Sequence, residues 1–583
     1  MRQHRQRQIW ASTTVWAASL TLLLVFSGCG SEAGMGSALE SSSASDKSSA
    51  YPNGGTGAAD AGGGSYASDG ASTQGGGSSN TSGPATGASD KDSGIGFKPG
   101  GAQDINYFRQ LVAQGTVPAP TDMTIEGWLN EKDTKLPSAS PDRTIVLHAL
   151  AGVVKSAGMD TPDAVIQLGF NSAKSLAQVK AKVALTLVID RSGSMKGDKL
   201  AYVKQGLHAL LDSLPADTRL ALVSFSSDVL TNWGPTVYDA SSHKAELDAV
   251  IDALVAVGGT NLHGGLEAGA QHCMSAGAEY PFRRVILLSD GQPTAGVTNA
   301  NLIIKLATDV KAKGVSVSTV GVGNGFNPTL MIGIAQQGDG TAWFLKDAAH
   351  AKDVFLNDLE TMLLPVAKDL WIKFKLAKGW KVDKIYGFDW VEKEGEVIIT
   401  GPSKGQDGGP TPVDPNEEPT DPDTGTPDED KVALPTLFAS KKNGMIMVSL
   451  LAPANVDGAL VNGLLLSTIS YGYTIAKVET KESFEVPVKV FGVIQIPDGG
   501  WAYFADPIVR RSYALLRAGL ALLEATKTAG EGDKVSALAA LDAALLVLDD
   551  QIKEVPESVD LAPGMPDAID LLEDLKTLLD KLP

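Results

Sequence analysis

The sequence predicts an α/β protein built on a doubly wound, mostly parallel sheet, with a flanking β-sandwich-like region and C-terminal helices. Three patterns support this fold class. Between residues 183 and 364, short apolar strands alternate with amphipathic helices, the order that produces a parallel sheet covered on both faces. After Pro365 apolar residues recur at every second position, as in half-buried strands. From Asp506 to Leu582 they recur at helical spacing.

Composition narrows the possible functions. The chain has 583 residues, 49 Lys and Arg against 68 Asp and Glu, a net charge of −19, and 43% hydrophobic residues. This acidity argues against nucleic-acid binding, because phosphates require a positive protein surface. Two cysteines cannot build a disulfide framework or a cysteine-rich zinc site. The sequence contains no P-loop and no HExxH motif, so we expect no nucleotide partner and no zinc-protease chemistry.

The N-terminus has the layout of a bacterial lipoprotein signal. Residues 1–28 combine a basic start, an apolar run from Val15 to Phe26 and small residues just before Cys29. We expect a signal peptide over residues 1–28 and lipidation of Cys29; the alternative is an ordinary secretory signal beside a chance cysteine. Gly30 stands where an Asp often retains lipoproteins on an inner membrane. The expected location is therefore the cell envelope, lipid-anchored in the outer membrane.

A Gly/Ser-rich stretch separates this leader from the expected folded part. Residues 29–103 contain scarcely any large apolar side chain, so we expect a disordered tether. Structure is expected to begin near Asp104. Residues 104–180 should then form one helix, ended by Gly115, and two strands near Thr144–Leu150 and Ala164–Phe170.

Residues 181–365 should form the α/β unit. Its expected strands are Val183–Ile189, Leu220–Phe225, Val285–Ser289, Val315–Val322 and Ala342–Leu345. Its expected helices are about Lys199–Leu214, Ser242–Val255, Leu262–Ala276, Asn299–Lys313, Pro328–Gln337 and Ala349–Leu363. In such a sheet a ligand site is expected at the carboxyl ends of the strands.

Residues 366–500 should form the β-rich region, and residues 501–583 the helical one. Within the former, residues 401–435 carry prolines and acidic residues that could suggest a calcium loop, but the prolines break its ligand spacing, which favours a disordered insertion. The expected helices are about Pro507–Ala529, Asp533–Lys553 and Met565–Leu582. Their Ala/Leu stripes indicate packing faces, with a partner-binding helical hairpin as the alternative.

Oxygen-bearing side chains occur at three places in the predicted α/β unit, two directly after strands and one just before a helix. The first strand runs into Asp190, Ser192 and Ser194 in a D-x-S-x-S loop, Thr260 stands in Gly-Gly-Thr-Asn just before a helix, and Asp290 ends a central strand. Each piece alone has a simpler explanation as a turn or a helix cap. Together, in this order, they predict a site of hard oxygen ligands suited to Mg²⁺ or, alternatively, Mn²⁺ or Ca²⁺.

On these residues, Val183–Leu364 resembles a von Willebrand factor type A domain, a Rossmann-like fold, with an intact metal-ion-dependent adhesion site. The resemblance implies that Ser192 and Ser194 coordinate the cation directly and that Asp190 and Asp290 act largely through bound waters. Thr260 would join or leave with ligand state. It also implies a protein partner that presents an Asp or Glu to the metal, since mostly neutral ligands leave the cation electrophilic.

A less specific resemblance covers about Asp104–Lys489. The segments Asn106–Pro118 and Ile125–Asn130 look like the N-terminal region of a bacterial group in which the A domain is embedded between such a segment and a β-rich domain. The strands that begin at Asp369 fit the second half. The acidic insertion and the helical C-terminus depart from that group, so its partners are not carried over.

No enzyme is expected. The seven histidines form no i, i+4 pair that would suggest zinc, and Cys273 on a predicted helix is interpreted as a buried or semi-buried thiol. Gly321-Val-Gly323-Asn-Gly325 lacks the third glycine of a dinucleotide loop, and no G-x-S-x-G elbow supports Ser192 or Ser194 as a nucleophile.

The leading hypothesis is thus a cell-envelope lipoprotein whose A domain binds a divalent cation and, through it, an acidic residue of a protein partner. The alternative is a structural scaffold of an envelope assembly, in which the metal only stabilises the domain. An accessory subunit of an ATPase-driven machine ranks last, because a lipid-anchored chain lies outside the compartment that holds ATP.

Overall fold

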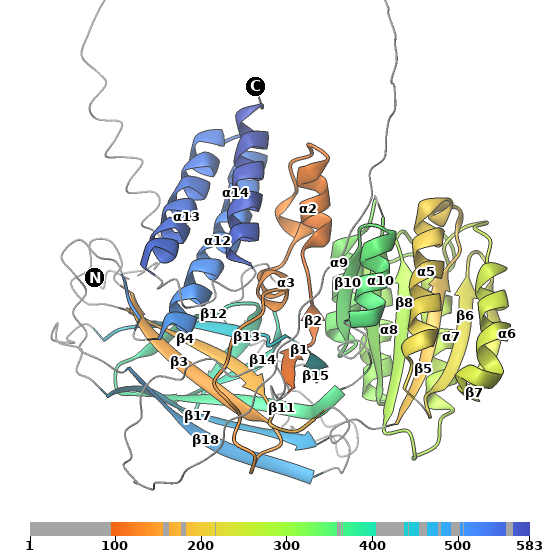
Figure 1. Cartoon of the computed structure of the whole chain (residues 1–583), viewed down its shortest axis with the longest axis horizontal. Coiled ribbons are helices and arrows are strands. Elements are labelled where there is room, and N and C mark those ends of the chain that lie inside the picture. Colours follow the sequence, from red (N-terminus) through yellow and green to blue (C-terminus); the bar gives the residue numbers. More distant parts are fainter. Residues whose placement is uncertain are drawn as a thin grey trace, which may run out of the picture. The chain divides into compact units, whose positions relative to one another are not determined.

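The structure is a computed structural model that describes residues 95–154, 163–175, 182–215, 217–323, 325–357, 363, 365–403, 436–440, 442–453, 463–475, 480–490, 502–504, 506–554 and 564–582 (Figure 1). The predicted signal peptide over residues 1–28, Cys29, most of the tether over 29–103 and nearly all of the insertion over 401–435 lie outside the described residues. Gly401 and Pro402, at the start of that insertion, belong to a strand.

The α/β unit contains a seven-stranded sheet with the order β2-β10-β9-β8-β5-β6-β7. The five predicted strands are β5 (Val183–Asp190), β6 (Arg219–Phe225), β8 (Phe282–Ser289), β9 (Val315–Val322) and β10 (Thr341–Leu345), all mutually parallel. Two edge strands were not predicted, the short β2 (Gly101–Ala102) and the longer β7 (Val229–Val237), the latter antiparallel to β6. The sequence of β7 does not alternate and carries Gly234 and Pro235, which strands tolerate mainly at an edge.

Helices cover both faces of this sheet. They are α5 (Asp198–Ser213), α6 (Ala240–Asp252), α7 (Leu262–Met274), α8 (Ala300–Ala312), α9 (Pro328–Gln337) and α10 (Ala348–Asn357). Apolar residues of α5, α6 and α10 share one core with side chains such as Leu187, while α7, α8 and α9 share another with side chains such as Val188 (Figure 1). Successive residues of β5 therefore point into opposite cores, which makes the unit doubly wound as predicted.

The β-rich region is one antiparallel sheet of twelve strands. They are β1 (Gly96–Pro99), β3 (Val146–Val154), β4 (Asp163–Asn171), β11 (Pro365–Leu376), β12 (Lys381–Ile385), β13 (Phe388–Lys393), β14 (Glu396–Pro402), β15 (Leu437–Ser440), β16 (Ile446–Leu451), β17 (Leu464–Ile475), β18 (Thr480–Val490) and β19 (Ala502–Tyr503). The early strands β4 and β1 are neighbours and lie between late ones, since β4 also pairs with β16 and β1 with β15. The β17–β18 hairpin packs across β3, where Tyr473 Oη accepts from Ile145 N at 3.0 Å, giving sandwich-like layers.

In the described part of the chain, regular secondary structure begins before Asp104, at Gly96. The predicted C-terminal boundary of the tether, residue 103, is therefore wrong. Residues 96–99 lie between β4 and β15 of the twelve-stranded sheet, and residues 101–102 pair with β10 of the seven-stranded sheet. The sequence Gly-Phe-Lys-Pro-Gly-Gly-Ala resembles a linker in composition, yet Phe97 is fully buried and Gly101 has a φ of +100°, which favours glycine.

Five helices pack together on one side of the β-rich region. They are α2 (Asn106–Ala113), α3 (Ile125–Asn130), α12 (Pro507–Gly530), α13 (Lys534–Glu554) and α14 (Met565–Asp580) (Figure 1). Trp128 of α3 is fully buried, donates from Nε1 to Leu515 O at 2.6 Å and lies against Gly519, so it anchors α12. Among the described residues, none of the helices is long and apolar enough to span a membrane.

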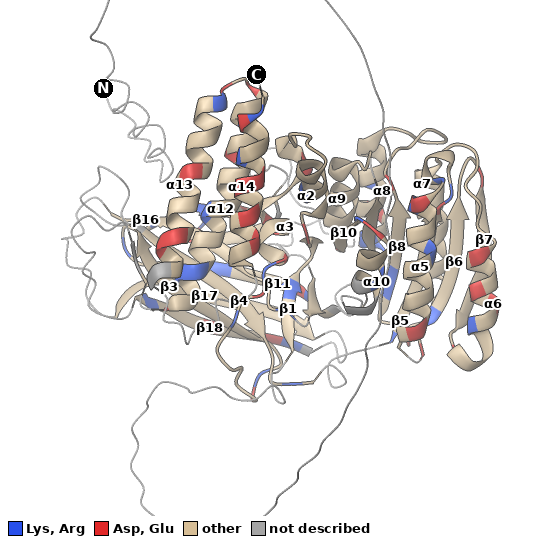
Figure 2. Ribbon diagram, turned by 45° about the horizontal axis from the view of Figure 1, so that its top comes forward, with Lys and Arg blue, Asp and Glu red and all other residues tan. Residues whose placement is uncertain are grey.

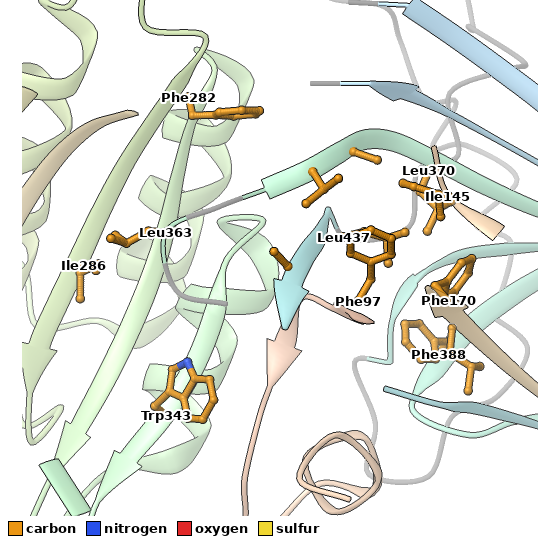
Figure 3. Packing of buried hydrophobic residues seen from close by; sticks show 14 of the residues in the cluster. Phe97, Ile145, Phe170, Phe282, Ile286, Trp343, Leu363, Leu370, Phe388 and Leu437 are labelled. Atoms are coloured by element: carbon orange, nitrogen blue, oxygen red, sulfur yellow. The ribbon is translucent and has the colours of Figure 1, made fainter. Parts of the chain in front are cut away.

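One hydrophobic core runs from the α/β unit into the β-rich region. Figure 3 shows Phe282 and Trp343 from the seven-stranded sheet, and Phe97, Leu437 and Leu370 from the other, as members of the same cluster. The two sheets are therefore joined by packing as well as by the chain. Acidic residues recur along the helices α13 and α14 (Figure 2).

Glu126 of α3 gives this junction a pH dependence. Its side chain is 4% exposed, and Oε1 accepts from Ala102 N at 2.9 Å and from Gln336 Nε2 at 2.6 Å. Burial raises the pKa of Glu126 from 4.5 to about 7, outweighing the two hydrogen bonds that lower it. The folded state therefore prefers the neutral acid.

We predict that Glu126→Gln removes this pH dependence. Because the folded pKa is raised, the wild-type contribution is fully present below about pH 4.5 and is lost as the pH rises through about 7. The variant should gain up to roughly 3 kcal/mol over wild type between pH 5 and pH 8. Urea unfolding at several pH values measures the difference, with exposed Glu531→Gln as control; parallel pH profiles of wild type and Glu126→Gln would contradict the prediction.

Candidate metal centre

The first arm of the predicted site follows β5. Asp190 ends the strand fully buried, and a 3-10 turn over Gly193–Met195 leads into α5. Asp190 Oδ1 accepts from Ser192 N at 2.8 Å, and Oδ2 accepts from Ser289 Oγ at 2.6 Å. The hydroxyl oxygens of Ser192 and Ser194 lie 3.1 Å apart, and Ser194 is exposed to solvent. The carboxylate is thus fixed at both oxygens, while the hydroxyl pair runs from buried Ser192 to exposed Ser194.

The second arm carries Thr260 and is bonded to the first. Val257 N donates to Arg191 O at 2.8 Å, and Gly193 N donates to Gly258 O at 3.0 Å. Gly258 has a φ of +76°, a conformation that glycine adopts without strain. Thr260 is itself buried, and the residue after it, Asn261, caps α7 by accepting from Gly264 N.

The third arm carries Asp290, at the end of β8 and next to β5 in the sheet. It is bonded to the second arm, because Thr294 N donates to Thr260 O at 3.0 Å. Asp290 is buried, and its Oδ2 accepts from Lys199 Nζ at 2.8 Å. Its other oxygen, Oδ1, is buried without a hydrogen-bond partner. A buried carboxylate oxygen without a donor is costly, and a bound cation is one way to satisfy it.

The electrostatics of the site agree with this shortage of positive charge. Burial raises the pKa of Asp190 to about 6, against hydrogen bonds from Ser289 and Ser192 that lower it, and the nearby Asp290 raises it further. The carboxylate of Asp290, at the adjacent strand end, therefore disfavours the charged form of Asp190. A divalent cation between the arms would relieve that repulsion.

The oxygen donors fit a hard divalent cation. Neighbouring ligands in an octahedral Mg²⁺ shell lie about 3 Å apart, since each is about 2.1 Å from the ion. The hydroxyl oxygens of Ser192 and Ser194 already have this separation. Across the described part of the chain, no group of three or more His, Cys, Asp and Glu could hold a metal, so this site depends on hydroxyls beside two carboxylates. The structure brings all five predicted residues to one edge of the sheet; their binding of a metal stays a prediction.

Comparison with known families agrees with the fold of the α/β unit. A family model described as the von Willebrand factor type A domain matches residues 184–357. This region is a von Willebrand factor type A domain.

Relatives extend this similarity in part. YfbK of Escherichia coli K12, an uncharacterized protein, is 27% identical over 278 residues, which are 47% of this chain and 48% of YfbK. The matches cover less than half the length of the curated relatives. A von Willebrand factor type A structure from Catenulispora acidiphila is 14% identical, with a TM-score of 0.46, over 76% of this chain and 91% of that one. Proximal thread matrix protein 1 of the mussel byssus, solved with zinc in its MIDAS motif, is 21% identical, with a TM-score of 0.27, over 30% and 46%.

Two residues of the A domain that touch the site were not predicted, Ser289 and Lys199. Ser289 orients Asp190 and accepts from Gly291 N at 3.0 Å, so it joins the first and third arms. Its place directly before Asp290 was the available signal, but a serine at a strand end has many uses. Lys199 stands five positions after Ser194, and only the fold brings it to Asp290.

The other candidate residues have structural partners in the A domain. Cys273 is buried, and burial raises the pKa of its thiol to about 11, so the thiolate is scarce at neutral pH. His208 bonds to Asp248 and Asp252 on α6. Gly321 and Gly323 close β9, where Gly321 lies against the ring of Phe326.

We predict that Ser289→Ala weakens divalent-cation binding by about 10- to 100-fold, because it removes the hydroxyl that donates to Asp190 Oδ2 and orients this carboxylate. Isothermal titration with Mg²⁺ and Mn²⁺ measures the affinity. Ser318→Ala, which removes an equally buried hydroxyl from β9 away from the arms, is the control and should keep wild-type affinity. Equal losses in the two variants would instead indicate a general loss of stability.

Proposed function

We propose that this chain is a cell-envelope lipoprotein whose A domain binds a divalent cation and, through it, an acidic side chain of a protein partner. The A domain itself indicates a role in protein–protein interaction. The observation that carries the metal-dependent part is the placement of buried Asp190 and Asp290 beside the hydroxyl pair of Ser192, which is buried, and Ser194, which is exposed. The preferred cation in this proposal is Mg²⁺, with Mn²⁺ or Ca²⁺ as substitutes. No catalytic role is proposed.

The division of labour among the residues supports this proposal. Asp190 is held by Ser289 and by Ser192 N, so it supplies fixed negative charge from below. Ser192 and Ser194 would contribute neutral oxygens above it. A cation held in this way stays electrophilic, and a carboxylate from outside can complete its shell. Ser194 is exposed, so such a carboxylate has access.

The envelope location rests on the N-terminal sequence. Residues 1–28 have the signal layout, Cys29 follows small residues, and the Gly/Ser-rich stretch supplies reach between a lipid anchor and the A domain. Lipidation of Cys29 and outer-membrane residence belong to this proposal. Radiolabelled palmitate incorporation into wild type and Cys29→Ser tests the anchor.

A scaffold is the second candidate, and one observation favours it. The helices α12 and α14 pack on α2 and α3, where Lys132 and Arg109 both contact Asp567. These helices share a hydrophobic core that contains none of the five predicted metal-site residues. If the scaffold hypothesis holds, removal of residues 506–583 should impair function more than removal of the metal.

We predict that Asp190→Ala abolishes saturable cation binding while the fold is retained. The substitution removes the fixed carboxylate below the hydroxyl pair, whereas the backbone pairing of β5 with β6 and β8 does not involve this side chain. Calorimetric titration of the chain after residue 29 should reach millimolar Mg²⁺, Mn²⁺ and Ca²⁺, because ligand-free sites of this type can be weak. Asp309→Ala, on the surface of α8, is the matched control. Unchanged binding in Asp190→Ala would refute the metal-dependent function.

A second prediction concerns the rim of the site. Val257 is 52% exposed, and its backbone N donates to Arg191 O, so this valine lies beside the first arm. Exposed apolar residues beside a charged site are suited to partner contact. Val257→Gln should lower cation-dependent partner binding about tenfold and leave cation affinity unchanged.

The control for that variant is Val237→Gln. Val237 is 48% exposed but pairs with Arg219 at the start of β6, at the sheet edge opposite the arms. Pull-down from envelope extracts, with Mg²⁺ or EDTA, would compare the two variants by the amount of EDTA-sensitive protein retained. Equal retention by Val257→Gln and wild type would exclude this rim from the interface.

A further inference from the structure

Lys199 places a positively charged ammonium group inside the candidate metal site. Its Nζ lies 2.8 Å from Asp290 Oδ2, its side chain is 18% exposed, and Asp290 is 1% exposed. An ammonium ion therefore contacts the carboxylate that is expected to face the metal. The other oxygen of Asp290 has no partner, so Lys199 satisfies this group only in part.

The position of Lys199 in its helix is unfavourable by local rules. It stands in the first turn of α5, where the helix dipole favours negative charge, and the N-cap Gly197 offers no side-chain cap. A residue that breaks a local rule without local benefit often serves a site. Here the benefit is the contact with Asp290.

The stem of Lys199 rests in a groove formed by Gly323. Gly323 has a φ of +72°, and a Cβ placed there would come within 2.6–3.0 Å of Lys199 Cγ, Cδ and Cε. The missing side chain at Gly323 leaves room for the lysine stem just beyond the end of β9. The ammonium is thus positioned by the backbone of a neighbouring strand and is more than an incidental surface charge.

We propose that Lys199 is a tethered cation that neutralises Asp290 in the metal-free A domain and competes with the divalent cation for it. This inference rests on the proposed metal site. In the metal-free form Lys199 stabilises the fold by compensating a buried charge. When a divalent cation binds, the ammonium is repelled by it and loses its share of Asp290, which lowers cation affinity. Lys199 therefore lowers the affinity for the divalent cation and stabilises the A domain without the cation.

The test is Lys199→Met, a substitution that keeps the length of the stem and removes the charge. We expect its affinity for Mg²⁺ and Mn²⁺ in calorimetry to rise about tenfold. In EDTA its thermal midpoint should fall by several degrees, and saturating Mg²⁺ should erase that difference. The expected result is higher cation affinity together with lower stability in EDTA. If Lys199 had only a structural role, its replacement would lower both the affinity and the stability.

Two further variants sharpen the test. Lys204→Met, on the same helix, removes an ammonium that bonds to Asp252 O, and it should leave cation affinity as in wild type. Gly323→Ala keeps the charge of Lys199 but fills its groove, and should also raise affinity, with some loss of stability from its positive φ.

The outcomes separate this inference from the proposed function. If wild type and Asp190→Ala both fail to bind cations, the metal site and this inference fall together. If wild type binds and Lys199→Met shows unchanged or weaker affinity, only the role of Lys199 is overturned. A tighter Lys199→Met that is less stable in EDTA supports it.

Discussion

The arrangement of the molecule depends on one extended segment, Gly96–Ala102, that belongs to two sheets. Its first half is an inner strand of the twelve-stranded sheet and its second half is an edge strand of the A-domain sheet, with Gly100 alone between them. Gly101 N also donates to Gly340 O at 2.8 Å. A linker of one residue permits little independent rotation, so the A domain is held by backbone hydrogen bonds as well as by packing.

Further contacts anchor the same end of the A domain. Asp339, just before β10, accepts from the backbone and hydroxyl of Thr436, and the Arg284 guanidinium lies 4.4 Å from the ring centre of Phe438. Burial lowers the pKa of Arg284 to about 10, although the nearby Asp339 raises it. Arg284 and Asp339 lie at the amino ends of the parallel strands, and the metal arms lie at the carboxyl ends. The end that is attached to the β-rich region and the end that carries the candidate site are thus different, which leaves the candidate site accessible.

The sequence predicted what periodicity and local motifs encode. Five parallel strands and the set of oxygen ligands follow from apolar alternation and from residues placed directly at strand ends. It did not predict β1 and β2, because Gly-Phe-Lys-Pro-Gly-Gly-Ala has linker composition and gains its order only from strands several hundred residues away. Lys199 was missed for the same reason. Nothing within its helix points to Asp290, and the pairing exists only once β5 and β8 are neighbours.

The two carboxylates of the site are compensated by different means, and this difference explains how it can be both buried and open to a cation. Asp190 receives hydrogen bonds from Ser192 N and Ser289 Oγ, which are fixed and remain whatever binds. Asp290 receives an ammonium on a flexible stem, which can withdraw. A site that relied on hydrogen bonds alone would leave charge uncompensated when empty. A site with two fixed ammonium partners would exclude the metal. One fixed and one displaceable partner stabilise the empty domain while leaving the carboxylate available for exchange.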